Sequence, residues 1–119
     1  MAVSDTFRAF VEDQLGRSLP VRSRRMFGGV GLYADDLFFA VLADDLLYLK
    51  VDDATRPRYE AAGMNAFDPM GTPMNGYWRV PGGVIEDADE LGRWAAEAVE
   101  VARRAKRPRG KSRRRRARE

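Results

Sequence analysis

The stretch that decides the fold is GGVGLYADDLFFAVLADDLLYLKV, residues 28–51. Two pairs of aspartates, at 35–36 and 44–45, separate runs of apolar and aromatic residues. Two-residue polar turns between such runs are typical of tight β-hairpins, so the pattern predicts an antiparallel meander. Its expected strands cover residues 24–27, 30–33, 37–42 and 46–51.

The central strands of this meander are apolar at nearly every position, as in LFFAVLA at 37–43. A strand with one solvated face alternates apolar and polar residues, whereas a strand covered on both faces does not. We therefore expect either cover on both faces of the sheet, or cover on one face and a partner on the other.

The glycines of the segment RRMFGGVGLY, residues 24–33, invite comparison with a phosphate-binding loop. Such a loop needs glycines followed by a helix whose free amides face the anion, and usually a lysine. Here a strand pattern follows Gly28, Gly29 and Gly31, and no lysine is nearby. We interpret these glycines as structural, marking a bulge, a bend or the close approach of another backbone.

The N-terminal part has the spacing of an amphipathic helix over residues 4–15. Ser4 stands where a side chain can cap the free amides of the first turn. One face of this helix is expected to enter the core through Phe7, Phe10, Val11 and Leu15.

The clearest helix covers residues 87–105, DADELGRWAAEAVEVARRA. Asp87 followed by Glu90 matches a capping box, in which each side chain bonds the backbone of the other. Glu100 and Arg104 are four residues apart, a spacing that favours a surface ion pair. The expected core face consists of Ala88, Leu91, Trp94, Ala95, Ala98, Val99 and Ala102.

The segment between the meander and this helix is less regular. TRPRYEAAG, residues 55–63, predicts a short helix with Thr55 as its cap. A loop is expected over 64–76, in which residues 66–68 are ambiguous between loop and strand. The segment YWRVP, residues 77–81, predicts a short strand closed by its proline.

Composition excludes several kinds of chemistry. The chain of 119 residues fits one domain, and it has neither cysteine nor histidine. Disulfides, thiolate metal sites and the commonest general base are therefore excluded. We expect a protein that is not an enzyme and assign no catalytic, cofactor-binding or metal-binding residue. A remote alternative is an enzyme that uses Lys50, or an acidic pair with a metal.

The longest apolar runs are too short to cross a bilayer. Residues 1–10 include an aspartate and no leucine-rich stretch, so they do not match a secretory signal. We therefore expect a cytoplasmic protein with no membrane partner.

Charge divides the chain into two parts. Residues 1–102 have 10 Lys and Arg against 17 Asp and Glu, and residues 103–119 have 11 against one. The tail, RRAKRPRGKSRRRRARE, has no large apolar residue to offset the entropy lost on ordering. We predict a folded domain over 1–104 and an arginine- and lysine-rich tail over 105–119, disordered from about Lys106.

A clustered basic arm is the electrostatic pattern of a protein that binds DNA or RNA. It would read phosphates rather than bases, because the tail has no aromatic residue. The alternative is a solubilising tail that folds back on the acidic body. A basic patch on the body could be extended by Arg22, Arg24 and Arg25. Their alternation along a strand would, however, divide these three side chains between the two faces of the sheet. The predicted nucleic-acid-binding residues are Arg103, Arg104, Lys106, Arg107, Arg109, Lys111, Arg113, Arg114, Arg115, Arg116 and Arg118.

Several spaced segments, taken together, resemble the N-terminal domain of the TfoX/Sxy family, over about residues 6–103. They are RRMFGGVGLYADDLFFAVLADDLLYLKVDD, YEAAGMNAF, YWRVP and DADELGRWAAEAVEVA. The marks that carry the resemblance are Met26-Phe27-Gly28-Gly29, Phe39, Leu49-Lys50-Val51 before Asp52, Phe67, Tyr77, Val80-Pro81 and Trp94.

The resemblance implies a small two-layer α+β domain in the order α-β-β-β-α-β-β-α, with a mainly antiparallel sheet and a secretion-chaperone-like layout. It also implies a regulator of natural competence that acts with a cyclic-AMP receptor protein at promoters, without catalytic activity. The founding members continue into a second, helical domain. We expect that domain to be absent here, with the arginine-rich tail in its place.

Two functional hypotheses follow. The first is a regulatory protein whose acidic body docks a partner, such as a transcription factor, while the basic tail holds DNA or RNA. The second is a protein–protein adaptor or homodimer that uses the sheet or exposed Met and Trp side chains, with the tail incidental.

Overall fold

The computed structural model describes residues 3–26, 28–69, 71 and 74–106 of the chain. They form a six-stranded antiparallel sheet and helices in two layers, with the strands in the order β1-β2-β3-β4-β6-β5. The elements are α1 (Asp5–Gly16), β1 (Arg22–Met26), β2 (Gly29–Ala34), β3 (Leu37–Ala43), β4 (Leu46–Lys50), α2 (Arg56–Ala61), β5 (Ala66–Phe67), β6 (Met74–Arg79), α3 (Gly82–Glu86) and α4 (Ala88–Lys106).

The predicted α+β class and the antiparallel sheet are confirmed. The order of elements has two members more than the order implied by the family resemblance. The polar strand β1 pairs with β2 along its whole length, from Arg22–Tyr33 to Met26–Gly29, which gives four strands before α2. The short helix α3 forms directly after Pro81 and precedes α4.

The two acidic turns form the predicted hairpins. Asp35 and Asp36 have φ angles of 50° and 68°, and Asp44 and Asp45 have φ angles of 53° and 56°. Left-handed conformation at both central residues is the geometry of a type I′ turn, whose twist matches that of the flanking strands. Aspartate tolerates this conformation better than most residues do, which explains why a pair of aspartates can close each hairpin.

The structural interpretation of the glycines is confirmed. A Cβ atom on Gly29 would lie 2.6 Å from the carbonyl oxygen of Leu42, so β3 approaches too closely for a side chain. A Cβ atom on Gly31 would lie 2.8 Å from side-chain atoms of both Met26 and Phe38. Strand β2, not a helix, follows the first glycines, so this segment does not have the geometry of a phosphate loop.

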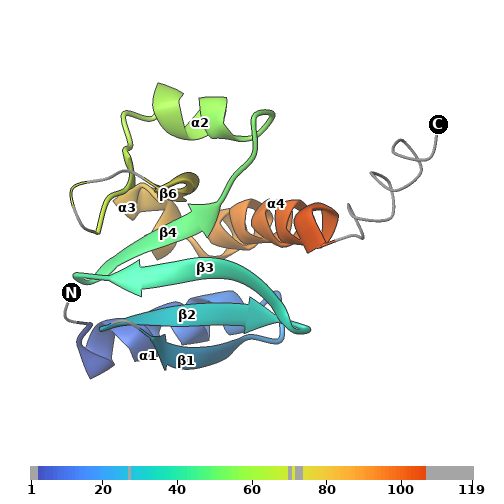
Figure 1. Cartoon of the computed structure of the whole chain (residues 1–119). Coiled ribbons are helices and arrows are strands. Elements are labelled where there is room, and N and C mark those ends of the chain that lie inside the picture. Colours follow the sequence, from blue (N-terminus) through green and yellow to red (C-terminus); the bar gives the residue numbers. More distant parts are fainter. Residues whose placement is uncertain (1–2, 27, 70, 72–73, 107–119) are drawn as a thin grey trace.

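The main core lies between the sheet and its helices. Figure 1 shows α1 behind β1 and β2, and α4 alongside β3 and β4. The fully buried side chains of this core come from both layers, and Tyr59 of α2 closes one side with its ring centroid 4.8 Å from that of Trp94. The central residues are Val11, Leu15, Val30, Leu32, Phe39, Leu42, Leu47, Leu49 and Leu91.

Helix α1 is capped by Ser4, as predicted, because its hydroxyl accepts a hydrogen bond from the Phe7 amide at 3.1 Å. The prediction for Phe10 was wrong, since this side chain is 41% exposed. The buried face of α1 instead includes Gln14, whose side-chain amide donates to the carbonyl oxygen of Ile85 at 2.9 Å.

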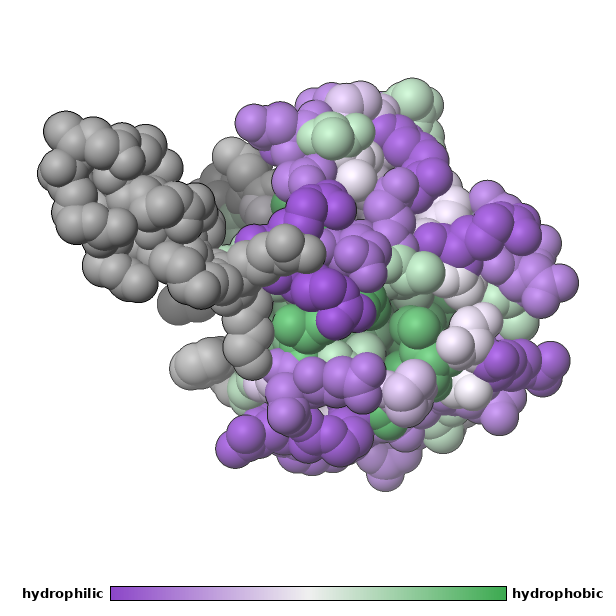
Figure 2. All heavy atoms as spheres, turned by 90° about the vertical axis from the view of Figure 1, so that its right-hand side faces the viewer, coloured by the Kyte–Doolittle hydropathy of each residue, from purple (hydrophilic) through white to green (hydrophobic). Residues whose placement is uncertain are grey.

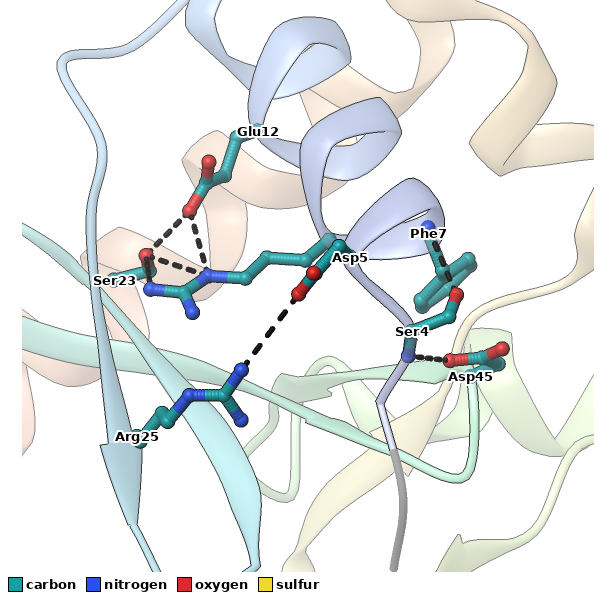
Figure 3. Close-up of polar contacts among 8 residues, drawn as sticks. Ser4, Asp5, Phe7, Glu12, Ser23, Arg25 and Asp45 are labelled. Carbon is teal, nitrogen blue, oxygen red and sulfur yellow. Dashed lines mark hydrogen bonds and ion pairs between the residues drawn. The ribbon is translucent and has the colours of Figure 1, made fainter.

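Polar contacts hold α1 against the sheet (Figure 3). The Ser4 amide donates to the Asp45 carboxylate at 2.7 Å, which joins the start of α1 to the β3–β4 turn. The Ser23 hydroxyl accepts from the guanidinium of Arg8 at 2.7 Å and donates to Glu12. The bonds of Ser23 attach the polar edge strand β1 to α1.

The other caps differ in detail from the prediction. Thr55 provides no side-chain cap to α2; instead Asp52 accepts hydrogen bonds from the amides of Ala54 and Thr55, both at 3.0 Å. Asp87 caps α4 by accepting from the Glu90 amide at 3.1 Å. The return bond of a capping box is replaced, because the Asp87 amide donates to the carbonyl oxygen of Val84.

The loop predicted over 64–76 contains a strand. Ala66 and Phe67 form β5, which pairs with β6, and β6 itself begins at Met74. A two-residue strand is too short to give a sequence pattern, so its pairing depends on the neighbouring strand rather than on its own residues.

Candidate nucleic-acid interface

The predicted basic interface begins at the C-terminal end of α4. Arg103 and Arg104 are exposed there, and Lys106 is the last residue of the helix. The other predicted residues lie outside the described part of the chain: Arg107, Arg109, Lys111, Arg113, Arg114, Arg115, Arg116 and Arg118. The assignment of these side chains to nucleic-acid binding stays a prediction.

Both described arginines contact carboxylates of the folded body. Arg103 Nε lies 3.1 Å from Glu100 Oε2, and Arg104 Nη2 lies 2.9 Å from Asp52 Oδ2. The predicted pair between Glu100 and Arg104 was therefore wrong, because Arg104 reaches across to the segment after β4 instead. The hydrogen bond from Arg104 is the main reason why the pKa of Asp52 lies below its usual value. These pairs are solvent-exposed, so a polyphosphate can compete for the arginines.

A second surface lies on the sheet face opposite α1 and α4. Residues paired across neighbouring strands share a face, and the pairs here are Tyr33–Phe38, Val41–Tyr48 and Lys50–Tyr77. We call the surface formed by Tyr33, Phe38, Val41, Ala43, Tyr48, Phe67 and Tyr77 the aromatic face. Its apolar cluster is built from strand residues alone among those that the structure describes.

The rings of the aromatic face contact one another in two groups. Tyr33 and Phe38 have ring centroids 5.2 Å apart, and Phe38 and Tyr77 have centroids 5.7 Å apart. Tyr48 and Phe67 form the other group, with centroids 4.8 Å apart. The interplanar angles lie between 32° and 48°, so the rings tilt against each other. Tyr33, Phe38 and Tyr48 are partly exposed, whereas Phe67 and Tyr77 are buried.

Cationic side chains border the aromatic face. Arg22 lies over the ring of Tyr33 at 5.7 Å and also pairs with Asp36 at 2.7 Å. Lys50 Nζ lies over the ring of Tyr77 at 4.9 Å. Arg24 is paired in register with Gly31, and Arg79 with Tyr48, so both belong to this face and both are exposed.

The expected division of the three arginines of β1 is confirmed. Arg25 lies on the opposite face from Arg22 and Arg24, toward α1, where its guanidinium is 3.7 Å from Asp5 (Figure 3). The aromatic face therefore receives two of the three charges.

Two hollows adjoin the aromatic face. One, of about 540 Å³, is lined by Leu46, Tyr48, Asn65, Ala66, Asp68, Trp78 and Arg79. The other, of about 340 Å³, is lined by Asp36, Leu37, Phe38, Lys50, Tyr77, Ala102 and Ala105, and so lies beside the end of α4. Figure 2 views the molecule from the right-hand side of Figure 1, toward the end of α4, and shows hydrophobic side chains gathered between hydrophilic ones.

Burial affects the pKa of two tyrosines of this surface, Tyr48 and Tyr77. Burial raises the pKa of Tyr77 to about 12. Burial likewise raises the pKa of Tyr48, against a smaller opposing effect of Arg79. Both hydroxyls are therefore neutral hydrogen-bond donors in the physiological range.

Sequence reasoning allowed one sheet face to meet a partner, but it did not identify the aromatic residues that form this surface. The alternation in β4, where Tyr48 and Lys50 point away from Leu47 and Leu49, was the available signal. It was obscured in β3, where the register with β2 shifts at Leu32 and Tyr33 and both faces of the strand are apolar.

Within the described ranges, no helix has the length and apolarity needed to cross a membrane. The molecule is thus a small α+β domain in which helices cover one sheet face and an aromatic surface with cationic neighbours forms the other.

The chain belongs to the TfoX N-terminal domain family, whose model matches residues 13–102. The match confirms the resemblance found in the spaced segments. A relative from Spirochaeta aurantia is 38% identical over 91 residues, which cover 74% of this chain and 73% of the relative. That relative is described as an uncharacterized 12.7 kDa protein in the trpE 5′ region.

Proposed function

We propose that this protein is a non-enzymatic, nucleic-acid-associated regulatory protein of the cytoplasm. Its folded body docks a protein partner such as a transcription factor, and its basic C-terminal segment contacts the phosphates of DNA or RNA. The observation that carries the proposal is the segregation of charge: 11 of the 21 Lys and Arg residues lie within residues 103–119.

The physical argument concerns where a polyanion can bind. The body over residues 1–102 has seven more acidic than basic residues, so the long-range attraction of a polyanion comes from the basic segment. The basic residues directly continue α4, which fixes the start of the segment at one end of the domain. Displacing condensed counterions from the nucleic acid then favours binding at that end.

The test is a salt-dependent binding titration on the intact chain. Fluorescence anisotropy with labelled duplex DNA and RNA would be followed from about 50 to about 200 mM salt. The variant R113Q/R114Q/R115Q/R116Q is expected to bind more weakly, with a slope of log K against log salt that is shallower by up to about 3.6. A control, R17Q/R93Q, removes exposed arginines of the body and should change little. Equal affinities and slopes for all proteins would reject the proposal.

The adaptor or homodimer hypothesis remains the second candidate, because the aromatic face has no helix packed on it among the described elements. The exposed Met74, on β6, would add apolar contact area. Sedimentation velocity over a range of protein concentration tests this function: a dimer supports it, and a monomer at the highest concentration rejects self-association.

The non-enzymatic part of the proposal has a separate test. A metal that binds the native state must raise its melting temperature. We expect the melting temperature to be unchanged by magnesium, manganese or calcium, and a clear rise with any of them would revive the option of a metal-dependent site.

A further inference from the structure

We propose that the aromatic face is a platform for single-stranded nucleic acid, with its rings contacting bases and its cations contacting phosphates. The inference rests on the proposed function in taking nucleic acid as the ligand. It differs in the surface that binds, because the aromatic face belongs to the sheet of the folded domain and not to the basic segment.

The first argument is the arrangement of rings on adjacent strands. Tyr33, Phe38 and Tyr48 come from β2, β3 and β4, which are neighbours in the sheet (Figure 1), and each is only partly buried. Bases of a single strand expose flat apolar surfaces that stack on such rings, whereas a duplex hides them. A row of partly exposed rings on a sheet therefore favours a single strand over a double helix.

The second argument is charge complementarity. Arg24 is exposed on the edge strand β1 and Arg79 on β6, and Lys50 lies on β4, which stands between these two strands in the sheet. Cations on both sides of an aromatic row suit a ligand that alternates bases with phosphates. They disfavour a second copy of this chain, because face-to-face packing would bury these cations among apolar side chains.

The third argument is the position of the two hollows. Asn65 and Asp68 line the larger one together with Tyr48, so a base stacked on this ring would have hydrogen-bonding residues nearby. The smaller one joins Phe38 and Tyr77 to Ala105 near the end of α4. One strand can thus contact the aromatic face close to the start of the basic segment.

The first experiment needs no variant. The full-length protein is titrated with a labelled single-stranded oligonucleotide, with an abasic oligonucleotide of the same length, and with a duplex of the same length. Stacking of one or two bases is expected to make the base-containing strand bind about tenfold or more tightly than the abasic strand. Equal binding of the two single strands overturns the inference, because the phosphates are the same in both.

The second experiment locates the effect. The variant F38L/Y48L removes two rings but keeps apolar side chains, and it should reduce the preference for the base-containing strand to near unity without changing the salt slope. Phe10→Leu is the matched control, since Phe10 is an exposed aromatic residue on α1, away from this face. A preference unchanged in F38L/Y48L, in protein with a normal circular dichroism melt, also overturns the inference.

The outcomes separate this inference from the proposed function. If R113Q/R114Q/R115Q/R116Q loses affinity but keeps the preference for bases, both are supported. If the intact protein binds every nucleic acid without such a preference, only the inference fails. If it binds none of them even at low salt, both fail. If F38L/Y48L instead dissociates a dimer and leaves nucleic-acid binding unchanged, the face is an interface between copies and the inference fails.

Discussion

The two faces of the sheet use similar residues for different purposes. On one face, Phe39, Leu42 and Leu49 are fully buried under the helices. On the other, Phe38 and Tyr48 are partly exposed, and their rings pack on those of Tyr77 and Phe67. A continuous run of apolar residues in β3 thus supplies one face that is covered by helices and one whose apolar cluster, among the described residues, comes from strands.

The comparison teaches that apolar character by itself does not identify a core. What distinguishes the two faces is the kind of apolar residue and its neighbours. The helix-covered face is rich in aliphatic side chains, whereas the other has aromatic rings with cations beside them. Aromatic rings can remain half-exposed and still bind ligands, which suits a surface for interaction.

The largest expected effect separates adjacent phenylalanines of β3. Phe39→Ala should lower the free energy of unfolding by about 3–5 kcal/mol, because it leaves a cavity in a close-packed core. Phe38→Ala should cost about 1–2 kcal/mol, since its site is open to solvent on one side. Urea denaturation measures both. Losses of equal size would mean that the two faces are equally packed.

The next effect concerns the two glycines of β2. Gly29→Ala should destabilise by about 1–3 kcal/mol, because its Cβ would meet the backbone oxygen of Leu42. Gly31→Ala should cost less, since its neighbours are side-chain atoms of Met26 and Phe38 that can move. Thermal unfolding of both variants checks the order. The reverse order would show that the aromatic face is more rigid than the strand backbone.

Alkaline titration compares a tyrosine of the aromatic face with a tyrosine of the main core. Burial raises the pKa of Tyr77 to about 12, and raises that of Tyr59 in the main core further. A pKa above the ordinary value of 10.0 means that folding favours the proton, so stability is complete below pH 10 and is lost as the pH rises toward 12. Tyr77→Phe should reduce this loss. Ultraviolet titration in which Tyr77 ionises near pH 10 would show an open, solvated face instead.

The smallest effect is expected where the folded body meets the basic segment. Arg104→Gln should raise the pKa of Asp52 toward its usual value and cost less than about 1 kcal/mol, because the pair is exposed. The contribution of a lowered aspartate pKa is present above pH 3.8 and is lost as the pH falls through the folded value. An NMR titration of the Asp52 carboxyl measures its pKa in the native protein and in the Arg104→Gln variant. Arg103→Gln is the control. If it changes the pKa of Asp52 as much as Arg104→Gln does, the pair between Arg104 and Asp52 is not specific.

The sequence allowed much of the meander to be predicted, because local chemistry determines it. The aspartate pairs at 35–36 and 44–45 fix the hairpins through their left-handed backbone, and Ser4 caps α1 through a hydroxyl three residues from its donor. Such features depend on neighbours in the chain. They are therefore visible before the tertiary structure is known.

Features that depend on distant residues were not predictable. Arg104 pairs with Asp52 rather than with Glu100 because folding brings the end of α4 close to the segment after β4. Gln14 is buried because its side-chain amide donates to the carbonyl oxygen of Ile85, 71 residues away in the chain. The aromatic face was hidden for the same reason, since only the pairing of β3 with β2 and β4 decides which rings share a side.

The difference between the two faces is tested most directly by mapping amide chemical shifts in the ¹⁵N-labelled full-length protein as a short single-stranded oligonucleotide is added. The account predicts shifts that change around Tyr33, Phe38, Tyr48 and Arg79, with little change along α1. Changes confined to the basic segment, or spread equally over α1 and the sheet, would contradict the assignment of the aromatic face as the surface that meets bases.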